Sequence, residues 1–120
     1  MKHLSIALAG ALLSVTAGFS HAADLAAGKA VWEKANCASC HGADAKSTID
    51  PAYPILAGQP ADFLAHALKA YQRGASGVAS TANIRKNAVM GAFATQLSAT
   101  DIANVSAWLA AQPGPLSVRK

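Results

Sequence analysis

Cysteine, aromatic residues and charge are all scarce in this chain. Only two of its 120 residues are cysteines, while aromatic residues make up 6% and charged residues 13% of the total. Cys37 and Cys40 fall in one short segment, so no disulfide can tie distant parts of the chain together. The formal net charge of +4 is small and dispersed, unlike the clustered basic surface of a nucleic-acid-binding protein. These shortages exclude a disulfide-stapled scaffold and a nucleic-acid partner.

The N-terminal segment predicts export. Lys2 precedes an apolar run from Leu4 to Phe19, and small residues follow the run. This arrangement is typical of a secretory signal peptide, and cleavage after Ala22 or after Ala23 fits it. The run has about 16 residues, whereas a membrane-spanning helix needs about 20. We therefore expect residues 1–23 to be a signal peptide, with an uncleaved anchor as the alternative.

Residues 24–120 are expected to form one periplasmic domain without an integral membrane segment. Apolar residues recur at helical spacing, and no alternating strand pattern of useful length occurs, so the domain is expected to be all-α. The predicted main helices run from the N-cap Asp24 to about Lys34, from Pro60 to Gly74, and from Ser98, with Asp101 as its capping-box partner, to Pro113. The loops between them, at 42–58 and 74–91, are long for a small domain unless they enclose something.

The two cysteines belong to the segment Cys37-Ala38-Ser39-Cys40-His41. Two thiols separated by two residues and followed by histidine are the pattern of c-type haem attachment. At this spacing the sulfurs reach the two vinyl groups on one edge of the porphyrin, and His41 supplies an imidazole nitrogen to the iron. A covalently held haem also provides the apolar core that a small domain lacks. The segment therefore predicts one covalent haem.

Three other uses of the cysteine pair account for fewer features of the sequence than a haem does. A thioredoxin-type pair needs a strand before it and a helix starting at it, and neither is predicted here. A zinc site needs two further ligands, and only His41 and His66 are available in residues 24–120. A local disulfide leaves His41 and the long loops without a role.

Met90 is the candidate sixth ligand of the iron. It is the only methionine in residues 24–120, and it lies in the second long loop ahead of the last helix. A thioether sulfur stabilises ferrous iron, and two protein ligands favour electron transfer over chemistry at the iron. The alternative for Met90 is a gap-filling core residue. The rival ligand is His66, which stands four residues after Asp62 and is expected to be a partly exposed, paired histidine.

Further segments accompany the haem motif in a characteristic order. They are Gly28 with Trp32, Tyr53-Pro54-Ile55-Leu56-Ala57-Gly58-Gln59, Leu68-Lys69-Ala70-Tyr71-Gln72-Arg73-Gly74, Asn87 with Met90, and the stretch from Leu97 to Trp108. In this order they resemble the class I c-type cytochromes, most closely the bacterial monohaem members similar to cytochrome c4 domains and cytochrome c553. The resemblance covers residues 26–112. It implies a small cytochrome c fold whose long loops wrap around one covalent haem c and its iron.

The resemblance also implies structural roles. Gly28 allows the first and last helices to cross closely, with Trp108 packed against the crossing. A glycine inside a helix costs about 1 kcal/mol relative to alanine, so a packing reason is expected. Pro54 offers its carbonyl oxygen to the Nδ1 proton of His41 and so fixes the imidazole.

Three residues are candidates for the haem propionates: Tyr71, Arg73 and Arg85. The planar fork of an arginine suits a carboxylate. One departure from the family's pattern is visible between the second helix and Met90. The segment 75–82 is longer and richer in Ser, Ala and Gly than the family pattern leads us to expect.

The resemblance implies a periplasmic electron carrier that exchanges single electrons with redox proteins through an exposed haem edge, and no catalytic residue. A second possibility is an electron-transfer subunit of a larger dehydrogenase or oxidase complex. A third is a haem enzyme with a labile Met90, for which no distal acid–base pair is evident. Candidates for a positive rim that steers an acidic partner are Lys46, Lys69, Arg85 and Lys86.

Overall fold

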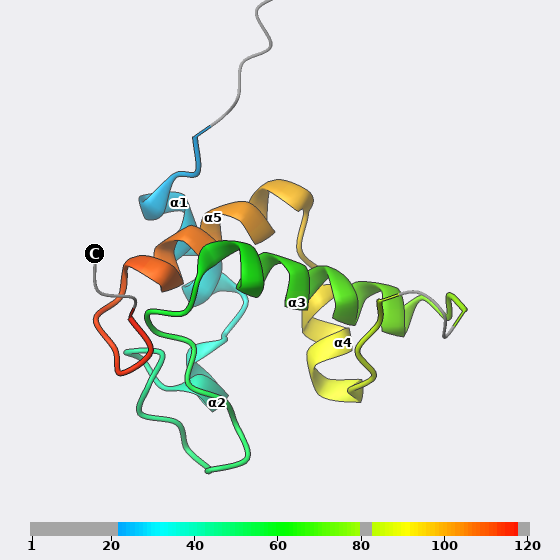
Figure 1. Ribbon diagram of the computed structural model, residues 1–120, viewed down its shortest axis with the longest axis horizontal. Coiled ribbons are helices and arrows are strands. Elements are labelled where there is room, and N and C mark those ends of the chain that lie inside the picture. Colours follow the sequence, from blue (N-terminus) through cyan, green and yellow to red (C-terminus); the bar gives the residue numbers. More distant parts are fainter. Residues whose placement is uncertain (1–21, 80–82, 118–120) are drawn as a thin grey trace, which may run out of the picture.

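The computed structural model describes residues 22–79 and 83–117 (Figure 1). The predicted signal peptide therefore lies almost wholly outside the described residues, as does the end of the segment 75–82. The described part contains five helices and no strand: α1 (Leu25–Lys34), α2 (Ala38–His41), α3 (Ala61–Ala75), α4 (Ala88–Ala94) and α5 (Ala99–Ala111). The prediction of an all-α domain with three main helices is confirmed, and these are α1, α3 and α5. No helix in the described ranges is long and apolar enough to cross a bilayer.

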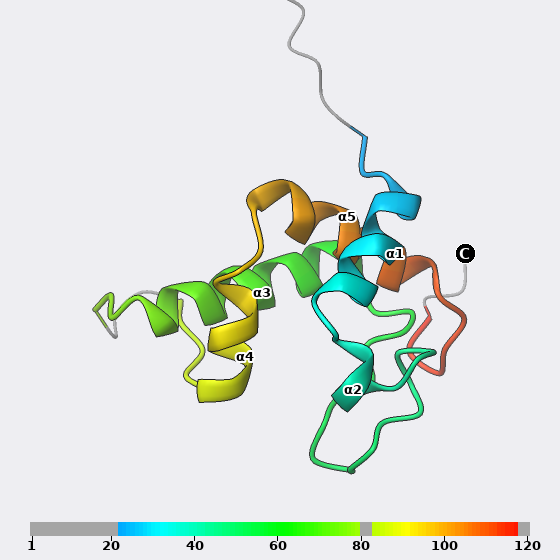
Figure 2. The same cartoon turned by 180° about the vertical axis from the view of Figure 1, so that it is seen from behind.

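The helices pack in a chain of neighbours. Helix α1 lies against α5, α5 lies against α3, and α3 lies against α4. Seen from both sides, α2 and α4 stand well apart, and the long α3 extends from the loop after α2 to the side of α4 (Figures 1 and 2). Residues of α2, α3, α4 and α5 line one cavity.

Helices α1 and α5 cross at Gly28, as predicted. A Cβ atom added there would lie 2.2 Å from the carbonyl oxygen of Asn104, so only glycine fits. The Asn104 side chain accepts a hydrogen bond from the backbone N–H of Asp24 at 2.9 Å. One helical turn past Gly28, the rings of Trp32 and Trp108 pack with their centroids 5.5 Å apart. The crossing thus packs Trp32, the tryptophan closer to the haem motif, against Trp108 of α5.

The predicted helix starts are correct. Asp24 caps α1 by accepting hydrogen bonds from two backbone N–H groups in the first turn. Helix α3 begins directly after Pro60. Ser98 and Asp101 form the expected capping box at the start of α5. These signals are local, so the sequence alone reveals them.

The predicted end of the second main helix is wrong. Gly74 does not stop α3, which continues to Ala75. A Cβ atom at Gly74 would lie 2.0 Å from the carbonyl oxygen of Arg85. Because Gly74 has no side chain, the segment that leads into α4 can approach α3 closely.

The second long loop is also not entirely a loop. Its end is the helix α4, so Met90 is a helical residue and not a loop residue. Asn87 begins this helix, since its side chain accepts a hydrogen bond from the Met90 N–H at 2.9 Å. A helix of seven residues shows barely two turns of periodicity, too few for the apolar pattern to predict it.

The loop after α2 turns sharply at Asp44. The Asp44 carboxylate accepts hydrogen bonds from the Lys46 N–H at 3.0 Å, and from the N–H and the hydroxyl of Ser47, both at 2.7 Å. These bonds favour the charged form and lower the pKa of Asp44 to about 2. Gly42, with φ of +80°, precedes this turn and carries the chain away from α2.

We expect Gly28→Ala to lower the free energy of unfolding by about 2 kcal/mol, because the added methyl group overpacks the crossing of α1 and α5. Denaturant unfolding of the haem-loaded protein measures the change. Ala30→Leu adds a larger group to the exposed side of the same helix and should change stability by less than about 0.5 kcal/mol. A Gly28→Ala protein as stable as the wild type contradicts the close crossing.

We expect Asp44 to titrate at a pKa of about 2 in an NMR experiment. Because the folded-state pKa lies below the unfolded value of about 3.9, its contribution to stability is present above that value and is lost as the pH falls toward 2. Ser47→Ala should move the pKa back toward the ordinary value, and Thr48→Ala should leave it in place. An ordinary pKa in the wild type would mean that this turn does not form.

Candidate functional site

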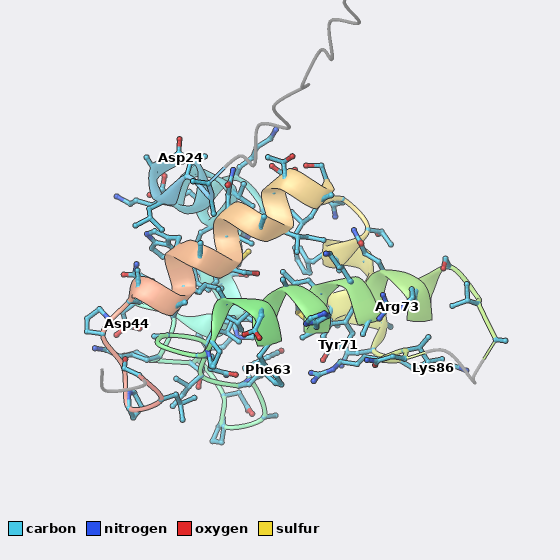
Figure 3. All side chains as sticks on the ribbon, turned by 45° about the horizontal axis from the view of Figure 1, so that its top comes forward. Asp24, Asp44, Phe63, Tyr71, Arg73 and Lys86 are labelled. Atoms are coloured by element: carbon cyan, nitrogen blue, oxygen red, sulfur yellow. The ribbon has the colours of Figure 1, made fainter. Side chains whose placement is uncertain are left out.

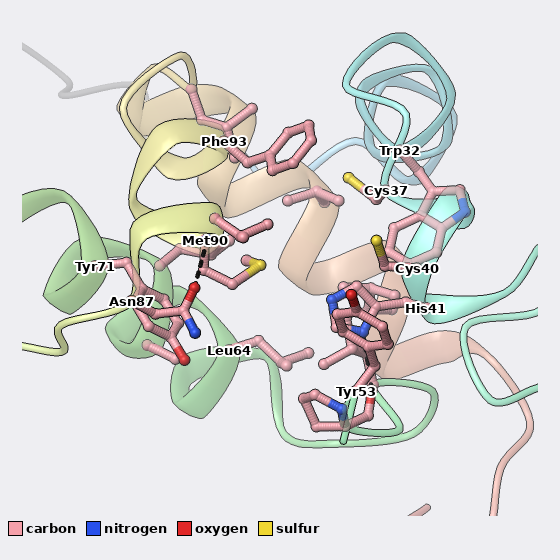
Figure 4. Close-up of a pocket in the computed structure, with 18 of the residues that line it drawn as sticks. Trp32, Cys37, Cys40, His41, Tyr53, Leu64, Tyr71, Asn87, Met90 and Phe93 are labelled. Carbon is pink, nitrogen blue, oxygen red and sulfur yellow. Dashed lines mark hydrogen bonds between the residues drawn. The ribbon is translucent and has the colours of Figure 1, made fainter. Parts of the chain in front are cut away.

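An apolar cavity of about 540 Å³ lies between α2 and α4 (Figure 4). This volume falls within the roughly 300–1,000 Å³ that is typical of ligand sites. Its apolar lining includes Leu56, Leu64, Leu68, Phe93, Leu97, Val105 and Leu109. Helices α3 and α5 supply most of these side chains. The cavity therefore suits a large, mostly apolar ligand.

One wall of the cavity carries the haem motif. Cys37 begins the short helix α2, and its carbonyl oxygen accepts a hydrogen bond from the His41 N–H at 3.1 Å. This single turn brings both thiols and the imidazole to one side, and the two sulfur atoms face the cavity (Figure 4). No disulfide joins Cys37 and Cys40, so the disulfide alternative does not describe this structure. Burial raises the pKa of the Cys37 thiol above its ordinary value.

His41 is a buried histidine with one nitrogen left free. The ring is only 5% exposed, and its Nδ1 lies 2.9 Å from the carbonyl oxygen of Pro54. A carbonyl only accepts hydrogen bonds, so Nδ1 carries the proton and Nε2 keeps its lone pair. That buried Nε2 has no hydrogen-bond partner. A buried polar atom without a partner is costly, and such an atom beside an anchored Nδ1 is the arrangement found at metal-ligating histidines.

Two aromatic rings hold the imidazole in place. The centroid of Trp32 lies 6.3 Å from that of His41, and Tyr53 meets the imidazole edge-on with centroids 6.1 Å apart. In the sequence, Trp32 is named only beside Gly28 as part of the family pattern, and no role is predicted for Tyr53. The one sequence signal for Tyr53 is its position directly before Pro54.

Met90 lies on the opposite wall. Its side chain is half-buried, and its sulfur points into the cavity toward His41 (Figure 4). The hydrogen bond from the Met90 N–H to Asn87 fixes the backbone at this position. A nitrogen lone pair and a thioether sulfur thus face each other across an apolar space.

The cavity mouth is formed by α3 and the segment before α4. The Arg85 guanidinium lies 5.5 Å from the ring centroid of Phe63 and 5.7 Å from that of Tyr71. Cations are attracted to aromatic faces at this range. Both rings stand along α3 in Figure 3. Tyr71 and Arg85 therefore meet at the cavity, where partners of the haem propionates are needed.

Arg73 does not reach the cavity. Its Nε donates a hydrogen bond to the carbonyl oxygen of Asn83 at 2.7 Å, farther along α3 (Figure 3). His66 is exposed and does not line the cavity either. It forms no ion pair with Asp62 within the described ranges, so the expected pairing is wrong. Of the basic residues expected to form a rim, Arg85 alone lines the cavity.

The donor set fits a c-type haem. Two thiols suit thioether attachment, and a histidine nitrogen opposite a methionine sulfur is a known pair of iron ligands. The cavity is apolar where the macrocycle would lie. In residues 22–79 and 83–117 no group of three or more His, Cys, Asp and Glu side chains comes together for another metal, so the zinc alternative finds no ligand set there.

Comparison with known proteins agrees with the family resemblance seen in the sequence. The family model for cytochrome c matches residues 25–112. Cytochrome c-554(547) of Halothiobacillus neapolitanus is 35% identical over 96 residues, which cover 74% of this chain and 97% of that protein. Cytochrome c-554(548) of Halomonas halodenitrificans is 36% identical over 76 residues, or 63% of this chain and 83% of that protein.

Two longer proteins match over part of their length. The thiosulfate dehydrogenase electron acceptor of Thiomonas intermedia (strain K12) is 39% identical over 70 residues, which are 58% of this chain and 28% of that protein. The crystal structure of reduced recombinant cytochrome c4 from Pseudomonas stutzeri superposes with a TM-score of 0.66 at 31% identity, covering 78% of this chain and 47% of that one. The chain thus spans less than half of these two proteins. It belongs to the cytochrome c family of electron-transfer proteins, and its cofactor is one covalently bound haem c with its iron.

Proposed function

We propose that this protein is a periplasmic electron carrier whose haem is attached through Cys37 and Cys40 and whose iron is bound by His41 and Met90. The observation that carries the proposal is the buried Nε2 of His41, which has no hydrogen-bond partner and faces the Met90 sulfur across the cavity. Bound haem supplies a one-electron couple between ferric and ferrous iron.

His41 is kept in one tautomer and one orientation. The Pro54 carbonyl accepts a hydrogen bond from the Nδ1–H group, which leaves the lone pair on Nε2, raises its basicity and directs it toward the metal. Trp32 and Tyr53 restrict rotation of the ring. A ligand held in this way moves little when the iron changes its charge, and little movement favours fast electron transfer.

Met90 sets the electron affinity of the site. A soft thioether favours the ferrous state and raises the reduction potential relative to a second histidine. The apolar lining acts in the same direction, since a low-dielectric surrounding disfavours the additional positive charge of ferric iron. Both effects suit a carrier that accepts electrons from a donor of lower potential.

The Arg85 guanidinium and the Tyr71 hydroxyl are proposed partners of the haem propionates at the cavity mouth. The exposed Arg85 guanidinium lies near the rings of Phe63 and Tyr71, and the planar fork of an arginine suits a carboxylate. Arg73 is the weaker candidate of the three, because Asn83 occupies its Nε.

A second candidate function is electron acceptance within a larger dehydrogenase complex. The Thiomonas intermedia relative is named as the electron acceptor of thiosulfate dehydrogenase, and this supports a dehydrogenase as donor. Co-elution of the holoprotein with a dehydrogenase that reduces it would favour this candidate over a free carrier. A haem enzyme with a labile Met90 has less support, because the cavity lining contains no carboxylate and no histidine besides His41 within the described residues.

We expect the exported protein to begin at Ala23 or Asp24 and to keep the mass of one haem after denaturation. Intact-mass spectrometry of protein isolated from the periplasm measures both. Cys37→Ala should leave a single thioether bond, and loss of both cysteines should leave no covalent haem. A mature protein that retains residues 1–22 would support the anchor instead.

Met90→Ala is expected to abolish the weak far-red charge-transfer band that marks a sulfur bond to ferric haem iron. It should also lower the reduction potential by on the order of 0.1–0.3 V, within the roughly 0.8 V that axial ligands span. Visible spectra and redox titration measure the two effects. Val89→Ala, which trims the neighbouring exposed side chain at the cavity mouth, should retain the band. A wild-type ferric protein that lacks the band contradicts ligation by Met90.

A further inference from the structure

Gln72 joins α3 to the far end of α4 through one side-chain amide. Its Nε2 donates to the carbonyl oxygen of Ala94 at 2.8 Å and to that of Leu97 at 2.9 Å. Ala94 is the last residue of α4, and Leu97 lies in the short link to α5. Both amide protons of the half-buried Gln72 side chain thus donate to carbonyl groups of one segment, the end of α4 and the link that follows it.

The carbonyl groups at the end of α4 need donors from outside the helix. The last four carbonyls of any helix lack an intrahelical partner, and a helix of seven residues has little stability of its own. Thr95 and Gln96 donate to carbonyls of α4 from within the same segment. Within the described residues, Gln72 is the one side chain that does so from another helix.

Helix α3 also holds the segment that leads into α4. The Arg85 N–H donates to the carbonyl oxygen of Ala70 at 3.0 Å, and the Arg85 carbonyl lies against Gly74. In the middle, Gly91 faces the Ala75 methyl group, where an added Cβ would lie at 3.3 Å. The segment that carries Met90 is therefore fastened to one helix at its beginning, middle and end.

We infer that Gln72 is a positioning residue that keeps Met90 on the iron. The inference rests on the proposed ligation by His41 and Met90. Losing the two hydrogen bonds frees the far end of α4, and the population in which Met90 is withdrawn from the cavity rises. In that population an external ligand binds the iron, so its apparent affinity reports how often the segment opens.

Imidazole binding to the ferric holoprotein measures this opening. Gln72→Leu is expected to bind imidazole about tenfold more tightly than the wild type, which corresponds to about 1.4 kcal/mol in the opening equilibrium. Gln72→Glu keeps the size of the side chain and removes the amide donors, so it should show the same direction at neutral pH. Amide hydrogen exchange at Thr95, Gln96 and Leu97 should accelerate in both variants.

The matched control is Gln96→Leu. The Gln96 amide also donates to a carbonyl of α4, that of Ala92 at 3.0 Å, but from the exposed side of the same segment. Its loss should change imidazole binding by less than about twofold. Equal imidazole affinities in the Gln72 variants and in Gln96→Leu would overturn the inference. Absence of the far-red band in the wild type would instead overturn the ligation by Met90, so the two failures are distinct.

Discussion

The site depends on one hydrogen bond, from Nδ1 of His41 to the carbonyl oxygen of Pro54. It links the haem motif to the loop that closes one side of the cavity, and it decides which imidazole nitrogen keeps a lone pair. Trp32 and Tyr53 limit the tilt of the ring, and the hydrogen bond decides which of its two nitrogens is turned to the cavity. The loop that carries Pro54 is held beside the motif by the N–H groups of Leu56 and Ala57, which donate to the Ala45 carbonyl oxygen at 2.9 and 3.0 Å.

Signals confined to a few residues could be predicted from the sequence. The haem motif, the cap at Asp24 and the capping box at Ser98 each depend on neighbours within four residues, so they can be recognised without a fold. The cost of a glycine inside a helix indicated that Gly28 has a packing role, and the family resemblance named the last helix as its partner.

Features that depend on distant segments could not be predicted in the same way. Helix α4 is too short for a periodic pattern, and its end is completed by Gln72 from another helix. Gly74 looks like a helix stop in the sequence, yet it serves the approach of Arg85 some ten residues later. Arg73 and Arg85 are indistinguishable by residue type. Only the course of the chain directs Arg85 to the cavity and Arg73 to Asn83.

The apolar cavity has a consequence for the order of assembly in the cell. A small domain has little core to spare, and here the buried residues Trp32, Leu64, Val105 and Leu109 all line the cavity that the haem would fill. Before attachment, the polypeptide gains little by closing around that space, and the free Nε2 of His41 opposes closure further. The domain is therefore expected to be loosely structured until the haem is bound, with both cysteine thiols accessible for attachment. Closure of the fold around the cavity is thus expected to follow the covalent step rather than to precede it.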